Sequence, residues 1–143
     1  MTTIAFDGKT LACDMQISYG DHVYANRSKK VDLDCGGVLV GAGELQDTHL
    51  VAEWINGGRD PERKPPVGDG YSAFVVIGGV VYELEHKLIL IPASPNVATG
   101  SGWGWATAAM DFGCNAVEAI EYAGKRDGGT SGLEIVYERQ SAI

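Results

Sequence analysis

A pair of threonines stands at the start of the chain, and an N-terminal threonine can act as a nucleophile. Thr2 follows Met1, and its small side chain leads us to expect that Met1 is removed. We expect that no propeptide has to be cleaved in addition. Thr2 then carries a hydroxyl and a free α-amine, whose unperturbed pKa of about 7.7–8.0 leaves part of it neutral near pH 7. A neutral amine beside a hydroxyl is a nucleophile with its own general base. The simpler alternative is an edge strand that begins with threonines.

Other residues that could support such chemistry stand at the ends of predicted elements: Asp14, Lys30, Ser101, Asp127 and Thr130. Carboxylates, an ammonium group and hydroxyls can orient a nucleophile and stabilise developing charge. Taken one at a time, each of these residues is also typical of a solvated surface. The sequence contains no P-loop and no GxGxxG, HExxH or GxSxG motif, so it indicates none of the sites that those motifs build.

Thr2 and Asp14 lie on a β-hairpin predicted over 1–14. Asp7-Gly8 is expected to form its turn, because this dipeptide readily adopts the backbone of a tight hairpin. With a strict two-residue loop at that position, Thr2 faces Cys13, and the side chain of Asp14 lies one step further on the other face. A bulge or a longer turn is then needed before Asp14 can reach a lysine of the site.

The rest of the chain alternates between strands and helices. Hydrophobic periodicity predicts helices over 44–56, 103–114 and 115–126, the last with a capping-box-like start at Asn115 and Glu118. It predicts strands over 29–33, 38–43, 72–77, 80–84, 87–91, 97–99 and 133–137. Residues 18–28, with a short extended piece, and the proline-rich segment 59–70 are expected to be loops. This order fits an α+β class with antiparallel sheets covered by helices on their outer faces.

Length, charge and cysteine content narrow the class of protein. The chain has 143 residues, which suits a single domain over 1–143 with a sizeable core. Its formal net charge of −8 opposes binding to nucleic acid, which requires clustered lysine and arginine. No apolar run is long enough to span a membrane, and three cysteines without metal-ligand spacing argue against a disulfide framework. We therefore expect a cytoplasmic protein with no membrane partner.

Several short motifs follow one another in an order that is typical of one family. They are Thr2-Thr3-Ile4, Ala12-Cys13-Asp14, Lys29-Lys30-Val31, Gly41-Ala42-Gly43, Ala98-Thr99-Gly100-Ser101-Gly102 and Arg126-Asp127-Gly128-Gly129-Thr130-Ser131-Gly132. In these motifs the chain resembles the β-type subunits of the proteasome and their bacterial relative HslV, which are N-terminal nucleophile (Ntn) hydrolases. The resemblance spans nearly the whole chain and implies a four-layer αββα sandwich, here in a compact version.

The resemblance implies a role for each candidate residue. Thr2 Oγ would attack a peptide carbonyl and form an ester intermediate, while its own α-amine accepts the proton. Lys30 would lie beside Oγ as a buried cation, and Asp14 would pair with it. Gly43 would offer a backbone N–H to the developing oxyanion. The polar shell around the α-amine would be completed by Ser101, Asp127 and Thr130.

The chain departs from the family pattern in its hairpin, in one helix and in one hydroxyl. Its first hairpin is shorter than is usual in the family. The loop over 59–70 takes the place of a long helix that helps to build rings, so a reduced first helical layer is expected. Thr130-Ser131-Gly132 stands where the family has Ser-Gly-Gly, which leaves either hydroxyl as the candidate.

The implied function is a threonine-type peptidase that cleaves peptides or polypeptides without a cofactor. It would act as a homo-oligomer, with a ring as one option, and an ATP-dependent unfoldase is a candidate partner. Two alternatives stay open. One is a catalytically inactive scaffold or assembly protein with the same fold, and the other is an Ntn hydrolase of small amides.

Overall fold

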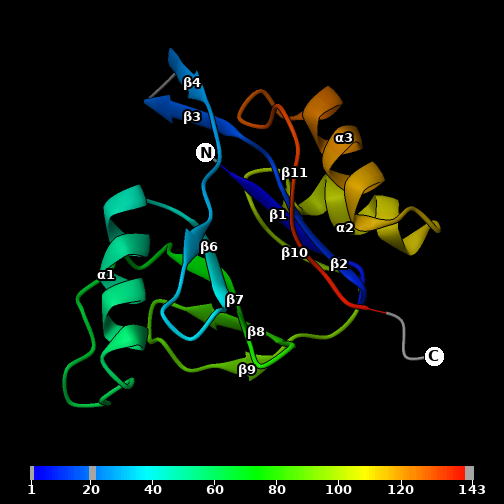
Figure 1. Cartoon of the computed structure of the whole chain (residues 1–143). Helices are drawn as coiled ribbons and strands as arrows, with labels where there is room; N and C mark the ends of the chain where they lie inside the picture. Colours follow the sequence, from blue (N-terminus) through cyan, green and yellow to red (C-terminus); the bar gives the residue numbers. More distant parts are fainter. Residues whose placement is uncertain (1, 20–21, 141–143) are drawn as a thin grey trace. The chain divides into compact units, whose positions relative to one another are not determined.

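The computed structural model describes residues 2–19 and 22–140, which fall into two compact units (Figure 1). The first unit contains the residues up to Ser28 together with those from Ala93 onward, and the second contains Lys29–Pro92. Each unit combines a sheet with helix, so the predicted mixture of helices and strands is confirmed. The four-layer arrangement and the single domain over 1–143 remain predictions.

The first unit contains, over its described residues, a four-stranded antiparallel sheet in the order β10-β1-β2-β11. Its strands are β1 (Thr3–Phe6), β2 (Thr10–Cys13), β10 (Val97–Gly100) and β11 (Glu134–Glu138). β1 pairs with β2 on one side and with β10 on the other, so the alternative of an edge strand at the start of the chain is wrong. Every residue of β1 and β2 is buried.

The hairpin of β1 and β2 exists as predicted, but its register differs from the one expected for an Asp7-Gly8 turn. Ile4 pairs with Cys13 and Phe6 with Leu11, so the two-residue loop is Gly8-Lys9. Each residue of β1 therefore faces a partner two positions later than expected. The N–H of Asp14 donates to the carbonyl of Thr3 at 3.0 Å, which extends this pairing to the end of the hairpin.

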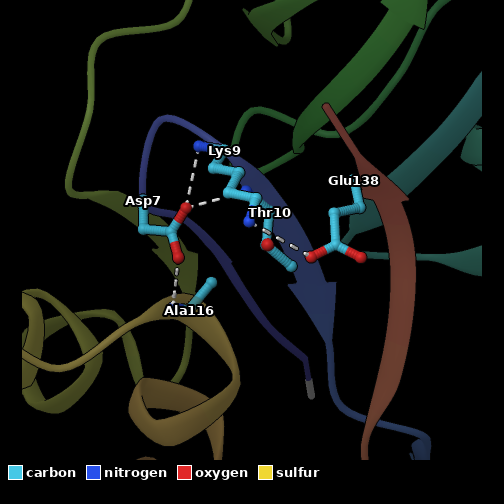
Figure 2. A network of polar contacts seen from close by, with 5 residues as sticks. All are labelled: Asp7, Lys9, Thr10, Ala116 and Glu138. Carbon is cyan, nitrogen blue, oxygen red and sulfur yellow. Dashed lines mark hydrogen bonds and ion pairs between the residues drawn. The ribbon is translucent and has the colours of Figure 1, made fainter. Parts of the chain in front are cut away.

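The side chain of Asp7 explains why the turn lies one residue later. Its Oδ1 accepts the backbone N–H groups of Lys9 at 2.8 Å and of Thr10 at 2.7 Å (Figure 2). Gly8, which can adopt a positive φ without strain, has a φ of 101°. An aspartate that precedes a turn stabilises it in this way, because its carboxylate accepts the backbone N–H groups that follow.

The helices α2 (Trp103–Asp111) and α3 (Ala116–Arg126) pack against this sheet (Figure 1). Small side chains dominate the core between helices and sheet, and its buried members are Ala5, Ala12, Ala106, Ala109, Met110, Ala116, Ala119, Ile120 and Ala123. α3 has the predicted capping box of Asn115 and Glu118. α2 ends before the predicted Cys114, because Gly113 with a φ of 103° lets the chain turn back to the carbonyl of Ala109.

Residues 18–28, which were expected to be mostly loop, belong largely to a two-stranded ribbon. β3 (Gln16–Tyr19) pairs with β4 (His22–Asn26), with a bulge between Ile17 and Ser18. The loop was predicted because the segment is polar. An exposed two-stranded ribbon needs few apolar residues when its base is anchored, so polarity alone did not indicate a loop here. The tip at Gly20-Asp21 lies outside the described residues.

The second unit contains, over its described residues, a five-stranded antiparallel sheet with one helix packed on it (Figure 1). The strands follow the order β5 (Val31–Asp32), β6 (Val38–Ala42), β7 (Ser72–Ile77), β8 (Val80–Glu85) and β9 (Ile91–Pro92). The helix is α1 (Leu45–Asn56). The predicted helix, the hairpin of β7 and β8 and the loop over 59–70 are confirmed. The buried core is formed by Leu33, Leu39, Val51, Ala52, Ile55, Tyr71, Ala73, Val75, Leu84 and Leu88.

The strand expected over 87–91 is wrong for most of its length. The N–H of Leu88 donates to the carbonyl of Glu85 at 2.9 Å, and Leu88 has a φ of 56°. This turn sends the Leu88 side chain into the core, so burial of one large apolar residue overrides the local strand pattern. Among the described residues, no helix is both long and apolar enough to cross a membrane.

Candidate active site

Thr2 directly precedes β1 and has a relative exposure of 5%. Its carbonyl accepts the N–H of Ser101 at 2.8 Å, just beyond the end of β10. The two segments of main chain approach this closely only because Gly100 lacks a side chain, since a Cβ there would overlap the Thr2 carbonyl oxygen. Gly100 also has a φ of 95°, which other residues rarely adopt. Thr2 is therefore held in place by its main chain.

Asp14 follows β2 and is almost completely buried, with 1% exposure. Its Oδ1 accepts the N–H of Thr3 at 3.0 Å. Its Oδ2 accepts the N–H groups of Gln16 at 3.2 Å and Ser131 at 3.3 Å. These donors come from the first strand, from the start of β3 and from the loop after α3, so one buried carboxylate joins three segments of the first unit.

A chain of hydroxyls connects the start of β1 to the end of α3. Thr130 Oγ1 donates to Asp127 Oδ2 at 2.6 Å, and Ser101 Oγ donates to the same oxygen at 2.5 Å. A threonine hydroxyl has one proton, so in the 2.6 Å contact between Thr3 Oγ1 and Thr130 Oγ1 the donor is Thr3. Thr3 Oγ1 in turn accepts the N–H of Gly102 at 2.9 Å. In this series of hydroxyl groups, each hydroxyl proton is thus donated in the direction of Asp127.

The surroundings of Asp127 favour its charged form. Burial raises the pKa of its carboxyl, but the hydrogen bonds from Ser101, Thr130 and the Gly129 backbone outweigh burial and lower that pKa below its usual value. The carboxylate stands at the C-cap of α3 and is connected to the sheet residue Thr3 through the hydroxyl of Thr130. It is an anionic acceptor that orders the neighbouring hydroxyls.

The two hydroxyls of the Thr130-Ser131 pair have different partners. Thr130 is buried and joins the chain that ends at Asp127. Ser131 Oγ instead donates to Gln16 Oε1 at 2.7 Å, at the base of the β3–β4 ribbon. Of the two hydroxyls that the motif left as candidates, the one that belongs to the candidate site is therefore that of Thr130.

Lys30 and Gly43 belong to the second unit, so their approach to Thr2 stays a prediction. Gly43 follows β6, is exposed and has a φ of 135°. Lys30 is exposed, which contradicts the expected buried cation at this position, whereas Lys29 is buried with 5% exposure. The expected burial of Lys30 is therefore wrong, while the role of either lysine at Thr2 stays a prediction.

The sequence does contain the signal that separates these lysines. In extended chain, alternate residues share a face. Lys29 shares its face with Val31 and the buried Leu33, while the face of Lys30 carries acidic residues. The structure also reveals a further site residue that the motifs did not single out, Thr3, whose only signal was its position beside Thr2.

Potential metal ligands are not grouped in the described part of the chain. Within residues 2–19 and 22–140, no three or more His, Cys, Asp or Glu side chains are arranged to hold a metal ion. The candidate site itself offers hydroxyls, two carboxylates and backbone N–H groups. These groups suit proton transfer and stabilisation of charge at a carbonyl centre.

The fold that carries this site is an HslV-like fold. No protein-family model matches the sequence, and no curated protein matches it either. The structure is similar to that of HslV from Trypanosoma brucei, with a TM-score of 0.67 and 19% identity over 94% of this chain and 97% of that chain. It is also similar to BPH from Thiobacillus denitrificans, with a TM-score of 0.68 and 13% identity over 99% of both chains.

A second structure of Thiobacillus denitrificans BPH, in complex with epoxomicin, has a TM-score of 0.67 and 13% identity over 98% of this chain and 99% of that chain. These similarities cover both units of the chain. They agree with the resemblance to HslV and proteasome β subunits that the motifs predicted.

Proposed function

We propose that this chain is a threonine-type peptidase whose nucleophile is Thr2 after removal of Met1. The observation that carries the proposal is a network of two carboxylates and two hydroxyl-bearing residues that contact Thr2 and Thr3 directly or through one another. These groups are Asp14, Ser101, Asp127 and Thr130. The HslV-like fold supports the same assignment, because it is the fold that the sequence motifs led us to expect.

In the proposed reaction, Thr2 Oγ attacks the carbonyl carbon of a peptide bond and its α-amine accepts the hydroxyl proton. The peptide C–N bond then breaks, the proton passes to the leaving amine, and an ester remains on Thr2. Water hydrolyses this ester by the same proton route in reverse, which frees the hydroxyl and completes the turnover. Ser101 and Asp127 would order the surroundings of the α-amine.

We propose Lys29, in place of Lys30, as the cation that stabilises the developing alkoxide of Thr2. Burial supports this choice, because an exposed ammonium is solvated by water whereas a buried one must interact with protein groups. A nearby ammonium also lowers the pKa of an amine by like-charge repulsion, which keeps the base neutral. Gly43 is proposed as the oxyanion donor, and its positive φ and exposure are compatible with an accessible N–H.

The assignment is tested by comparing wild type with Thr2→Ala and Thr2→Ser on fluorogenic peptides. We expect T2A to have no hydrolysis above background and T2S to keep a measurable part of it, because serine retains the hydroxyl and the amine. Treatment with a peptide epoxyketone such as epoxomicin, followed by intact-mass analysis, should give one adduct per chain in wild type and none in T2A. Equal hydrolysis by wild type and T2A would contradict the proposal.

The same intact-mass measurement reports on Met1. We expect the purified protein to lack one methionine residue relative to the printed sequence. Retention of Met1 would block the α-amine and would favour the scaffold alternative. The four-layer sandwich, the cytosolic location and an ATP-dependent unfoldase as partner remain parts of this proposal.

A further inference from the structure

Asp7 lies at the opposite end of β1 from Thr2, and its carboxylate accepts three backbone N–H groups (Figure 2). Oδ1 receives those of Lys9 and Thr10 in the hairpin turn. Oδ2 receives the N–H of Ala116, the first residue of α3, at 2.8 Å. One carboxylate therefore attaches the end of β1 to the beginning of α3.

The helix α3 also has a capping box of its own, which does not involve Asp7. Asn115 accepts the N–H of Glu118 at 2.8 Å, and the Glu118 carboxylate accepts the N–H of Asn115 at 3.0 Å. This capping box, together with Lys125 and Arg126 in the last turn, already stabilises both ends of α3. The bond from Asp7 lies outside this capping box and ties the first turn of α3 to the end of β1.

The two elements that Asp7 joins also meet at their other ends, in the candidate site. Asp127 is the C-cap residue of α3, and the series of hydroxyl groups leads from Asp127 to Thr3 at the start of β1. Asp7 is five residues from Thr2 in extended chain, which spans about 16 Å. The 11 residues of α3 span about the same distance, roughly 16 Å. A shift of α3 along its axis at one end would therefore appear at the other.

We propose that Asp7 is a positioning residue of the candidate active site, which sets the position of Asp127 against Thr3 and Thr2 by holding the first turn of α3 at the hairpin. This inference rests on the proposed function, in which Thr2 is the nucleophile. The carboxylate of Asp127 orders two hydroxyls, so a displacement of α3 moves this whole polar group relative to the nucleophile. A misplacement of about 1 Å can slow an enzyme by about 100-fold.

Asp7→Asn separates the two attachments. An amide has a single oxygen acceptor, and asparagine readily uses it to close a turn, so the bonds to Lys9 and Thr10 can persist. The amide nitrogen then faces the N–H of Ala116, and two donors cannot bond. We expect D7N to keep the hairpin and lose the attachment of α3, whereas Asp7→Ala removes both.

The N–H of Gly102 donates to Thr3 Oγ1 and so reports on the site without requiring activity. In D7N we expect amide hydrogen exchange at Gly102 to be about tenfold faster, with exchange at Thr10 unchanged. We expect kcat for a fluorogenic peptide to fall about tenfold and KM to change less than about twofold, since orientation is lost and substrate contacts are kept.

Asn115→Ala is the matched control, because it weakens the same end of α3 and leaves the bond of Asp7 in place. We expect N115A to lower the melting temperature while kcat and the Gly102 exchange rate stay at wild-type values. Wild-type kcat and Gly102 exchange in D7N, or equal losses in D7N and N115A, would overturn the role of Asp7. If wild type does not hydrolyse peptides, the proposed function fails, and Gly102 exchange alone then decides whether Asp7 positions Asp127.

Discussion

At the scale of residues, the direction of each hydrogen bond in the candidate site follows from the single proton that each hydroxyl group carries. Thr130 has one hydroxyl proton and gives it to Asp127, which leaves Thr3 as the donor to Thr130. The backbone N–H of Gly102 then supplies Thr3 with a donor of its own. Replacing Thr3 by an apolar residue leaves the N–H of Gly102 without its acceptor, and replacing Thr130 leaves the hydroxyl of Thr3 without one, at a cost of about 1–3 kcal/mol for a buried group.

The two adjacent lysines provide a sharp test of the residue assignment. We predict that Lys29→Met lowers kcat/KM at least about 100-fold, because it removes the buried cation that we propose to stabilise the Thr2 alkoxide, whereas Lys30→Met changes it less than about twofold. Methionine keeps the length and apolar stem of lysine in both variants. Peptide hydrolysis and circular dichroism of each variant provide the comparison. The opposite order of effects would return the role to Lys30.

The lowered pKa of Asp127 predicts a dependence of stability on pH. A carboxylate whose pKa is lower in the folded state contributes stability that is fully present above its unfolded pKa of about 3.9 and is lost as the pH falls through the folded value. We predict that Asp127→Asn lowers the free energy of unfolding at pH 7, and that the difference from wild type shrinks as the pH falls below about 4. Urea unfolding at pH 7, 4 and 3 measures this difference. A constant difference across that range would contradict the assigned shift.

The sequence predicted the helices and central strands well at the scale of elements. Periodicity and the capping box identified α1 and α3, and the Gly78-Gly79 turn identified the hairpin of β7 and β8. The register of the first hairpin could not be predicted, because it depends on which backbone N–H groups the Asp7 carboxylate accepts, here those of Lys9 and Thr10. The hydroxyl chain could not be predicted either, since Thr3 and Thr130 meet only through the packing of helices on the sheet.

The approach of β10 to Thr2 predicts a strong effect at Gly100. Gly100→Ala would drive a Cβ into the Thr2 carbonyl oxygen and force a positive φ on alanine. We predict that it lowers the free energy of unfolding by about 3 kcal/mol or more. Gly104 provides the control, since it lies in α2 and a Cβ added there would have no neighbouring atom within 4 Å. Gly104→Ala should be neutral or stabilising by up to about 1 kcal/mol in chemical denaturation.

The proposed homo-oligomer is the main expectation at the scale of the whole molecule. The loop over 59–70 carries neither helix nor strand, so any ring must form without a helix at this place. We predict that light scattering after size exclusion gives a mass of at least two chains of 15.2 kDa. The measurement should be repeated with T2A, in which assembly is expected to persist. A monomer with hydrolytic activity would favour the small-amide alternative.

β1 lies between two partner strands, and this has a practical consequence for anyone who alters the protein. The carbonyl of Thr2 accepts the N–H of Ser101, and the next residue begins a strand that is paired on both sides, so the main chain at Thr2 is held by bonds that do not involve its side chain. A different side chain can therefore be placed at this proposed nucleophile position by changing one codon, while these main-chain bonds are kept.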